Sequence, residues 1–261
     1  AAQLAELNRN AEQPLEFLAQ ETPPRTVTIP EPFLLGQTEV TVGQFRVFVK
    51  ESGHQTDAEK HEGWGVENNG WYRRPGFNWQ NMGGFIVGDQ HPAGNLSWHD
   101  ARAFCDWLNS KSHKIGGRRI RFRLPVESEW EYACRAGSAD LWFFGPDGSR
   151  LADFAVVESN RPQTVGSRRP NGFGLYDMLG NESEWCLDLF AQYEDSPGGV
   201  TIDSSFVNSV ANDGSSGRRV QRGGTFSFPA LRQRPASREG GNPRSPDQGA
   251  FRVLGEFVSD Q

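Results

Sequence analysis

The sequence predicts an α+β fold in a single domain with long loops. Three helical patterns occur between residues 41 and 137, and short β-like or irregular segments fill most of the remaining chain. Gly and Pro are abundant, at 30 and 16 of 261 residues, and 8 Trp and 18 Phe supply large apolar side chains. This composition is typical of a compact, aromatic-rich and loop-rich protein. Because no internal repeat or low-complexity linker divides the chain, one domain is expected.

The chain is expected to begin with an arm and two strands. The first 24 residues mix charged side chains with Gln, and they are interpreted as an N-terminal arm ahead of a domain at residues 25–261. Residues 25–30 and 33–41 are predicted strands. Residues 54–90 contain many Gly and Trp but show neither a helical nor a strand period. They are predicted to form a long ordered loop or a functional surface.

Three helices are predicted from their ends and from their apolar spacing, at residues 41–53, 97–112 and 125–137. Polar residues that accept hydrogen bonds from a first helical turn begin the first two helices, and Gly ends the first and the third. The expected N-terminal residues are Thr41 with Gln44, Ser97 with Asp100, and Pro125 followed by an acidic turn. The apolar stripe of the second helix comprises Ala101, Phe104, Cys105 and Leu108.

The charge distribution limits the possible partners. The formal net charge of −6 argues against a nucleic acid or an anionic membrane. Residues 116–125 alternate Arg with Ile and Phe, which favours an edge strand with one solvent-facing side over a binding patch. No apolar run approaches the roughly 20 residues that cross a membrane. The opening "AAQLAEL" is compatible with a mature N-terminus after A-x-A cleavage, so a periplasmic or exported location is expected.

Cysteine and histidine spacing does not predict a transition-metal site. The three Cys lie far apart and form no CxxC pair, which argues against a zinc site and a disulfide framework. Cys105 and Cys134 are interpreted as buried packing residues, whereas Cys186 is ambiguous. No His pair has the spacing of a metal-binding helix, and the closest useful pair is His91 and His99.

The stretch "YDMLGNESEW" at residues 176–185 is the strongest ion signal. Asp177 and Glu184 lie on either side of a tight turn that contains Gly180. Carboxylates and backbone carbonyls on an irregular loop are the oxygen ligands that calcium prefers. The carboxylates could equally point into water, and spacing alone does not decide between these two interpretations.

Six ordered blocks resemble the formylglycine-generating enzyme family, also called sulfatase-modifying factors. The resemblance covers roughly residues 25–255 and implies a C-type-lectin-like α+β domain with little regular secondary structure. The blocks are "TEVTVGQFRVFV", "HPAGNLSWHDARAFCDWLN", "RFRLPVESEWEYACRAG", "NGFGLYDMLGNESEW", "RGGTF" and "GAFRV".

The resemblance implies a structural calcium ion at the acidic turn. Its ligands would be the side chains of Asp177 and Glu184 and the backbone carbonyls of Gly180 and Glu182. Ser183 stands where the family usually has Trp, which affects the expected substrate groove more than the calcium site.

The family's copper chemistry is not expected in this chain. Family enzymes oxidise a substrate cysteine with copper(I), which is bound by two cysteines just after the "RGGS" block. Residues 222–239 contain no cysteine here, and copper(I) requires sulfur ligands. Cys105 and Cys134 match disulfide positions of secreted members, but their expected partners fall near Val253 and Pro235. Free thiols, no copper and no formylglycine formation are therefore expected.

Two function hypotheses remain, and the first is an oxidoreductase. The chain resembles the pyoverdine-maturation type within this family, which lacks the copper cysteines and is expected to oxidise a dihydro-fluorophore in a siderophore precursor. Glu239 is the candidate catalytic base, although it could instead form a surface ion pair with Arg238 or Arg244. The candidate residues for binding a peptide-like small molecule are Arg232, Arg234, Arg238, Ser183 and Thr225.

The second hypothesis is a non-catalytic binding module for a peptide, protein or glycan. The implied fold presents variable loops on a rigid scaffold, and fold alone does not determine function. The aromatic-rich stretch from Trp64 to Phe85 would provide the binding surface. The sequence itself therefore leaves open whether the protein is an enzyme.

Overall fold

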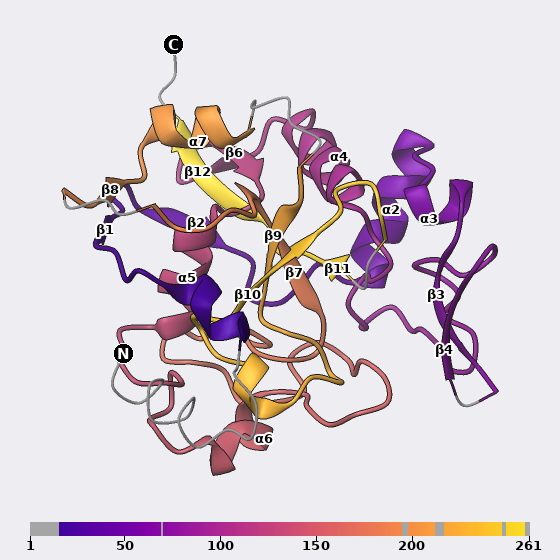
Figure 1. Ribbon diagram of the computed structural model, residues 1–261. Coiled ribbons are helices and arrows are strands. Elements are labelled where there is room, and N and C mark those ends of the chain that lie inside the picture. The colour runs from indigo at the N-terminus through magenta and orange to yellow at the C-terminus, as the bar shows by residue number, and fades with distance from the viewer. Residues whose placement is uncertain (1–15, 69, 195–197, 212–216, 247–248, 259–261) are drawn as a thin grey trace.

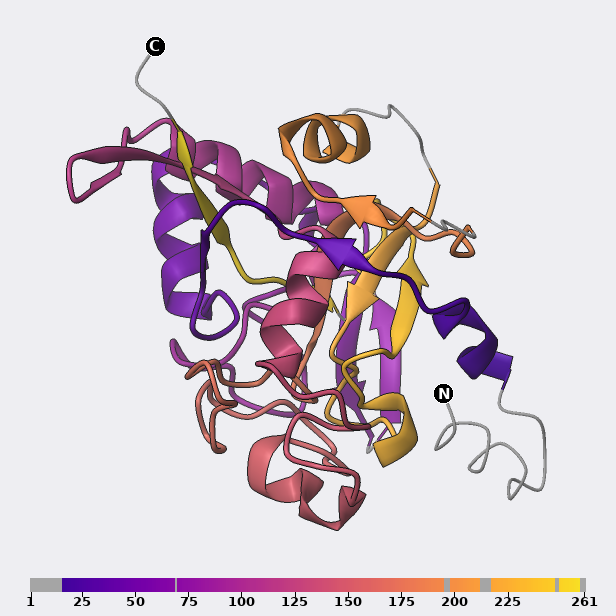
Figure 2. The ribbon, with the colours of Figure 1, turned by 90° about the vertical axis from the view of Figure 1, so that its left-hand side faces the viewer.

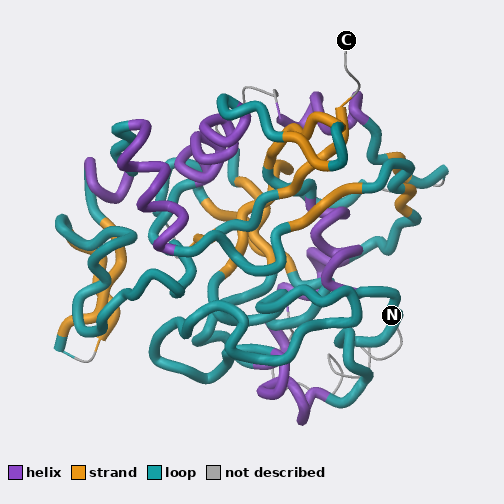
Figure 3. Tube along the Cα trace, turned by 180° about the vertical axis from the view of Figure 1, so that it is seen from behind, coloured by secondary structure: helices purple, strands orange, loops and turns teal. Residues whose placement is uncertain are grey.

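The α+β prediction is confirmed by the computed structural model (Figure 1), which forms one body with two curled sheets and few helices. Loops connect most elements (Figure 3). The structure describes residues 16–68, 70–194, 198–211, 217–246 and 249–258. Most of the predicted N-terminal arm, residues 1–15, therefore lies outside the described residues.

The three predicted helices are present, and local capping explains where they begin. Thr41 and Ser97 each accept a hydrogen bond from the third residue of their helix, and that residue's side chain accepts one in return. The α-helices are α2 Val42–Ser52, α3 Asp57–Lys60, α4 Trp98–Asn109, α5 Glu127–Arg135, α6 Leu151–Phe154 and α7 Ser204–Ala211. The 3-10 helices are η1 Glu16–Glu21, η2 Gly148–Arg150 and η3 Ala230–Arg232.

Two four-stranded sheets form the centre of the protein, in the orders β10-β9-β7-β11 and β2-β12-β6-β5. A parallel pair β1-β8 and a hairpin β3-β4 complete the strands. The first six are β1 Val27–Thr28, β2 Phe33–Leu35, β3 Gly63–Glu67, β4 Gly70–Arg74, β5 Lys114–Ile115 and β6 Arg118–Arg123. The others are β7 Ser183–Leu189, β8 Val200–Thr201, β9 Arg219–Arg222, β10 Arg238–Gly241, β11 Gly249–Ala250 and β12 Leu254–Val258.

Strand β7 separates two apolar clusters and carries the end of the acidic turn into the core. Trp185 belongs to the cluster that contains α2 and α4, whereas Cys186 belongs to the cluster around α5. Successive strand residues point to opposite faces of a sheet, so one strand contributes to both clusters. Six of its seven residues are buried, which makes β7 the rigid base of the neighbouring loops.

Three element predictions were wrong. The stretch 54–90 is not a loop throughout, because it contains α3 and the β3-β4 hairpin, which stands at the edge of the molecule in Figures 1 and 3. Its interpretation as a functional surface stays a prediction. The chain after Gly137 is not only strands and loops, because it also forms α6 and α7. Strand β6 is not an edge strand, since β12 pairs along one side and β5 pairs with its first residues on the other.

We expect Gly241→Ala to destabilise the protein by about 1–3 kcal/mol, the usual cost of overpacking a filled core. A Cβ atom at this position on β10 would collide with the indole ring of Trp185, which is fully buried. Urea unfolding would measure the change. The matched control is Gly198→Ala, since Gly198 is exposed and its Cβ would meet open space. Equal stability of the two variants would contradict the expected collision.

Candidate functional site

The segment that holds the copper cysteines in family enzymes connects β9 to β10. The two strands pair antiparallel, with Arg222 opposite Arg238 and Gln221 opposite Glu239. The connection, called here the 222–239 segment, leaves β9 through Gly223 and Gly224, which have φ values of 93° and 74°. This left-handed backbone favours Gly, so the pair allows the chain to turn sharply at the end of β9.

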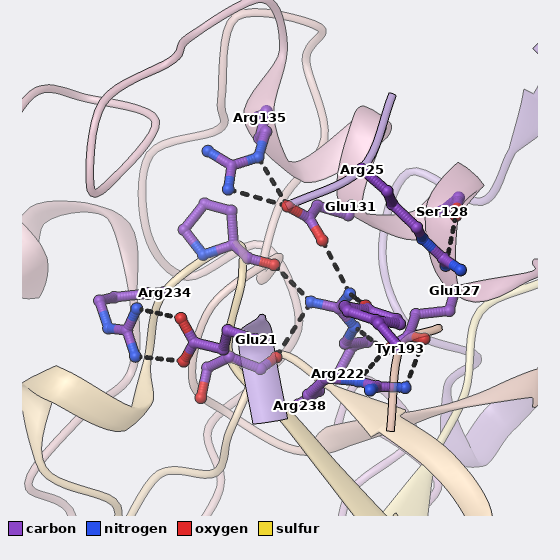
Figure 4. Close-up of polar contacts among 12 residues, drawn as sticks. Glu21, Arg25, Glu127, Ser128, Glu131, Arg135, Tyr193, Arg222, Arg234 and Arg238 are labelled. Atoms are coloured by element: carbon purple, nitrogen blue, oxygen red, sulfur yellow. Dashed lines mark hydrogen bonds and ion pairs between the residues drawn. The ribbon is translucent and has the colours of Figure 1, made fainter. Parts of the chain in front are cut away.

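Arg222 connects the 222–239 segment to helix α5 (Figure 4). Its guanidinium donates to Glu127 Oε1 at 2.9 Å, to Glu131 Oε2 at 2.8 Å and to the Pro235 carbonyl at 2.6 Å. Burial alone would raise the pKa of Glu131, but Arg222 and Arg135 lower it below its ordinary value. These contacts give Arg222 a structural role at the base of the segment.

Arg234 and Arg238, two of the predicted substrate-binding residues, are almost wholly buried in ion pairs. Arg238 donates from Nε and Nη2 to the two oxygens of Glu127, at 2.7 and 2.8 Å. Arg234 donates from Nη1 and Nη2 to the two oxygens of Glu21, at 2.8 and 2.5 Å. Both guanidinium groups therefore face protein carboxylates and not an open groove, so direct substrate contact is not supported in this conformation (Figure 4).

Arg232 and Glu239 form the partly open part of the site. Their ion pair joins η3 to β10, and the two side chains are 38% and 27% exposed. The guanidinium carbon of Arg232 also lies 4.7 Å from the ring centre of Phe228. Burial raises the pKa of Glu239, and the nearby charges of Arg232 and Arg218 oppose this shift. Glu239 does form an ion pair, but with Arg232 and not with Arg238 or Arg244, the expected partners.

Ser183 and Thr225, the other predicted substrate-binding residues, are covered by protein. Their exposed fractions are 4% and 2%. Ser183 begins β7 opposite Gly249 on β11. The hydroxyl of Thr225 lies 3.0 Å from that of Ser227. Neither side chain offers an open surface, so the structure brings together only Arg232 and Glu239 as accessible members of the predicted set.

Arg252 holds one carboxylate of the acidic turn. Glu184 receives hydrogen bonds from Nη2 and Nε of Arg252 at 2.5 and 2.6 Å, and from the Trp130 indole at 2.7 Å. Arg252 also donates to the carbonyls of Gly36 and Tyr176. Both oxygens of Glu184 thus have protein donors, which removes much of the repulsion expected in this turn.

A second carboxylate pair, Asp177 and Glu39, lies beside this ion pair. Each is 1% exposed and has one buried oxygen to which no N–H or hydroxyl group donates, Oδ1 of Asp177 and Oε2 of Glu39. Their other oxygens accept hydrogen bonds from the backbone of Gly166 and the side chain of Asn181. Burial raises the pKa of both carboxyls. The charges of Asp177 and Glu184 raise the pKa of Glu39 further, whereas a hydrogen bond with Glu39 opposes the shift of Asp177.

The residues fit calcium only in part. Asp177 and Glu39 have unsatisfied buried oxygens, which a cation would satisfy. Glu184 does not share this property, because Arg252 and Trp130 occupy its oxygens. The side chain of Glu182 is also buried with an unpartnered oxygen, and burial raises its pKa well above the ordinary value. Within the described ranges, no group of three or more His, Cys, Asp or Glu side chains is arranged to hold a metal ion.

The donor set does not fit copper(I). The 222–239 segment contains neither Cys nor Met. The three cysteines are free and buried in α4, α5 and β7. Burial raises the pKa of Cys105 to about 12 and also raises those of Cys134 and Cys186. Thiols of this kind are inert packing groups and do not supply the thiolate ligands that copper(I) requires.

Sequence reasoning missed Glu39, Arg252 and Glu127, although all three lie in the quoted family blocks. Their partners are far away in the chain. Arg252, for example, is 68 positions from Glu184. The blocks marked these residues, but no local spacing showed which charge each one balances.

The comparisons with known proteins agree with this architecture. Residues 5–256 match the sulfatase-modifying factor enzyme 1-like domain, and the chain belongs to this family. It is similar to the formylglycine-generating enzyme of Streptomyces coelicolor, with 32% identity over 244 residues that cover 79% of this chain and 71% of that enzyme. The mouse formylglycine-generating enzyme is 28% identical over 243 residues, which cover 79% of this chain and 60% of the mouse protein.

Solved structures add a more specific likeness. PvdO from Pseudomonas aeruginosa matches with a TM-score of 0.68 and 26% identity, over 92% of this chain and 86% of PvdO. Treponema denticola variable protein 1 matches with a TM-score of 0.66 and 24% identity, over 90% of this chain and 88% of that protein. The second likeness shows the shared fold alone.

Proposed function

We propose that this protein is a copper-independent oxidoreductase that oxidises a dihydro precursor of a siderophore fluorophore of the pyoverdine type. The observation that carries the proposal is a 222–239 segment without sulfur ligands that still holds a partly open carboxylate and guanidinium. The likeness to PvdO from Pseudomonas aeruginosa, together with the resemblance of the sequence to the pyoverdine-maturation type, supports the substrate class. An exported or periplasmic location belongs to the same proposal, and cell fractionation would test it.

In the proposed reaction, Glu239 removes a proton from the dihydro substrate as two electrons leave the ring. The acceptor takes the two electrons and the second proton. With dioxygen as the acceptor, Glu239 then releases its own proton as well, so that the product is hydrogen peroxide and the carboxylate is regenerated. A carboxylate whose pKa is raised by burial is a stronger base than an exposed one. Arg232 orients Glu239 through the ion pair, and its partly exposed guanidinium would donate hydrogen bonds to an anionic part of the substrate.

We expect Glu239→Gln to reduce the oxidation rate by about 100-fold or more, because an amide accepts no proton. The measurement is the appearance of fluorophore absorbance from a dihydropyoverdine-type precursor, together with oxygen consumption. The wild-type rate should rise with pH as Glu239 loses its proton, at a pH above the ordinary glutamate range because its pKa is raised. Glu31→Gln, at an exposed carboxylate between β1 and β2, is the control and should retain the full rate. A folded Glu239→Gln variant with wild-type turnover would reject the catalytic role.

We also propose a structural calcium ion at the acidic turn, bound by Asp177 and the Gly180 and Glu182 carbonyls, with Glu39 in place of Glu184. Elemental analysis should find about one equivalent of calcium after purification in its presence. Calcium at 100 times its dissociation constant should stabilise the fold by about 2.7 kcal/mol. Asp177→Ala should abolish this effect, whereas Glu184→Gln should keep it. An unchanged melting temperature with calcium and with chelator would reject the site.

The alternative function, a binding module, is favoured by a different surface. The β3-β4 hairpin and the loop that follows it expose Tyr72 and Ile86, at 41% and 90%. Trp71 anchors this region, since its ring lies 5.5 Å from that of Phe226 on the 222–239 segment. Among the described residues, no helix is long and apolar enough to span a membrane. A protein that binds a peptide tightly but never oxidises a dihydro precursor would support this alternative.

A further inference from the structure

The first described residues of the chain lie against the 222–239 segment. Residues 16–21, which form η1, run beside β10 (Figures 1 and 2). Leu18 is buried among them, whereas Ala19 is exposed. The side chain of Gln192 donates hydrogen bonds to the Ala19 and Thr22 carbonyls, at 3.0 and 3.1 Å. A six-residue 3-10 helix has little stability of its own, so its position depends on these contacts with the body.

The strongest of these contacts is the ion pair between Glu21 and Arg234. The guanidinium is fixed before it meets Glu21, because its Nε donates to the Leu231 carbonyl at 2.6 Å. Nη1 and Nη2 then point together at the carboxylate, in the two-pronged geometry by which Arg recognises carboxylates. The two side chains are 1% and 2% exposed, so the pair is screened from water.

The carboxylate that pairs with Arg234 comes from a different part of the chain than the carboxylate that pairs with Arg222 and Arg238. Arg222 and Arg238 pair with Glu127 of α5, inside the domain. The carboxylate that Arg234 receives in the described part of the chain comes from the terminal segment, 213 positions away. Figure 4 shows this pair at the side of the cluster, apart from the Glu127 contacts.

An aromatic ring accompanies the carboxylate. The ring centre of Phe17 lies 5.6 Å from the guanidinium carbon of Arg232 and 6.0 Å from that of Arg234. The Gln20 carbonyl accepts a hydrogen bond from Arg238 at 3.2 Å. Residues 16–21 thus place a ring, a carbonyl and a carboxylate on three arginines, as a docked peptide would.

We propose that Arg232 and Arg234 form a binding site for a ligand that carries a carboxylate close to an aromatic group, and that residues 16–21 occupy this site until the ligand displaces them. If the carboxylate of the ligand replaces that of Glu21, Arg234 stays paired. A neutral ligand would instead leave the buried charge of Arg234 unpaired. The site would therefore reject ligands without a carboxylate. Because Arg232 also pairs with Glu239, the ligand's ring would lie near the candidate base. The identification of this ligand as the substrate rests on the proposed oxidoreductase function, but the binding site itself does not.

The test uses the full chain with Phe17→Ala and Glu21→Ala, which remove the ring and the carboxylate that occupy the site. The probe is a fluorescein-labelled synthetic peptide with the sequence of residues 14–24, and fluorescence anisotropy reports its binding. We expect the peptide to bind the double variant at least tenfold more tightly than it binds the wild-type protein. A peptide with Gln in place of Glu21 should bind at least tenfold more weakly, and adding Arg234→Met should abolish binding. Glu31→Gln is the matched carboxylate control and should behave as wild type. Equal affinity for the wild type and the double variant, or equal binding of the two peptides, would overturn the proposal.

A second measurement applies if the double variant does not fold. Hydrogen exchange of the wild-type protein should show amides of residues 16–22 exchanging well before those of β9, and faster still with saturating unlabelled peptide. Exchange of residues 16–22 only together with β9 would make the segment a permanent part of the fold and overturn the proposal. Neither readout requires turnover. Peptide binding without oxidation would reject the proposed enzyme function alone, and oxidation without peptide binding would reject the displaceable segment alone.

Discussion

Arg252→Met should destabilise the fold by about 3–5 kcal/mol, the range observed when one partner of a buried ion pair is removed. The variant leaves Glu184 buried without its guanidinium, beside the carboxyls of Asp177 and Glu39. It also removes the donors to the Gly36 and Tyr176 carbonyls. Met approximates the length of the Arg side chain, so most of the loss should come from charge and hydrogen bonding. Urea unfolding at pH 7 would measure it.

Two comparisons isolate the buried charge as the cause. Arg121→Met removes an ion pair with Glu256 whose arginine side chain is 45% exposed, and its effect should stay within about 1 kcal/mol. Adding Glu184→Gln to Arg252→Met should recover part of the loss, because a neutral amide still accepts the Trp130 hydrogen bond. Similar destabilisation by the Arg252 and Arg121 variants would show that the burial of the Glu184 carboxylate does not depend on Arg252.

The second large effect concerns Asp188 on β7 and appears as a dependence of stability on pH. Burial, with the nearby charge of Glu127, raises the pKa of Asp188 to about 7. In the unfolded chain the carboxyl ionises near its ordinary value of 3.8, so the folded state binds the proton more tightly. This contribution to stability is complete below about pH 4, falls as the pH rises to about 7 and is then constant. The total change is up to about 4 kcal/mol, at roughly 1.4 kcal/mol for each pH unit.

Asp188→Asn should remove this slope and leave the protein more stable than the wild type at pH 8. The amide oxygen can still accept the hydrogen bond that the Glu127 backbone donates to Asp188 at 2.7 Å. Unfolding free energies at intervals from pH 4 to 8 would show the difference between variant and wild type. Asp106→Asn, at an exposed position of α4, is the matched control for an Asp-to-Asn substitution. If the unfolding free energies of wild type and Asp188→Asn differed by the same amount at every pH, the raised pKa of Asp188 would be contradicted.

The parts of the fold that local sequence determines were predictable. Helix α2 follows from Thr41, Gln44 and Gly53, because capping depends on residues three or four positions apart. The β3-β4 hairpin has a local signal as well, since Asn68 with φ of 49° precedes Gly70 at the turn. Its strands lack a clear alternation of apolar and polar residues, so the sequence did not predict them. Helix α7 has few strong helix formers, and its formation depends on packing of Val207 into the first apolar cluster.

The candidate site was less predictable because its charges pair across the chain. The 222–239 segment was found from the position of the missing cysteines, and Glu239 from its place at the segment's end. The partners of Arg234 and Arg238 are 213 and 111 positions away, and no period or motif links such residues. A run of arginines therefore looked like an open binding surface, whereas three-dimensional pairing places two of them inside.

The three buried thiols give the protein built-in reporters of local opening. Cys105 lies in the apolar cluster of α2 and α4, whereas Cys134 and Cys186 lie in the cluster on the other side of β7. A thiol-reactive dye can label each only after its surroundings open. Mass spectrometry of proteolytic fragments would show which thiol reacts first as denaturant is added. The unmodified protein would thus show whether the two apolar clusters open in one step or one after the other.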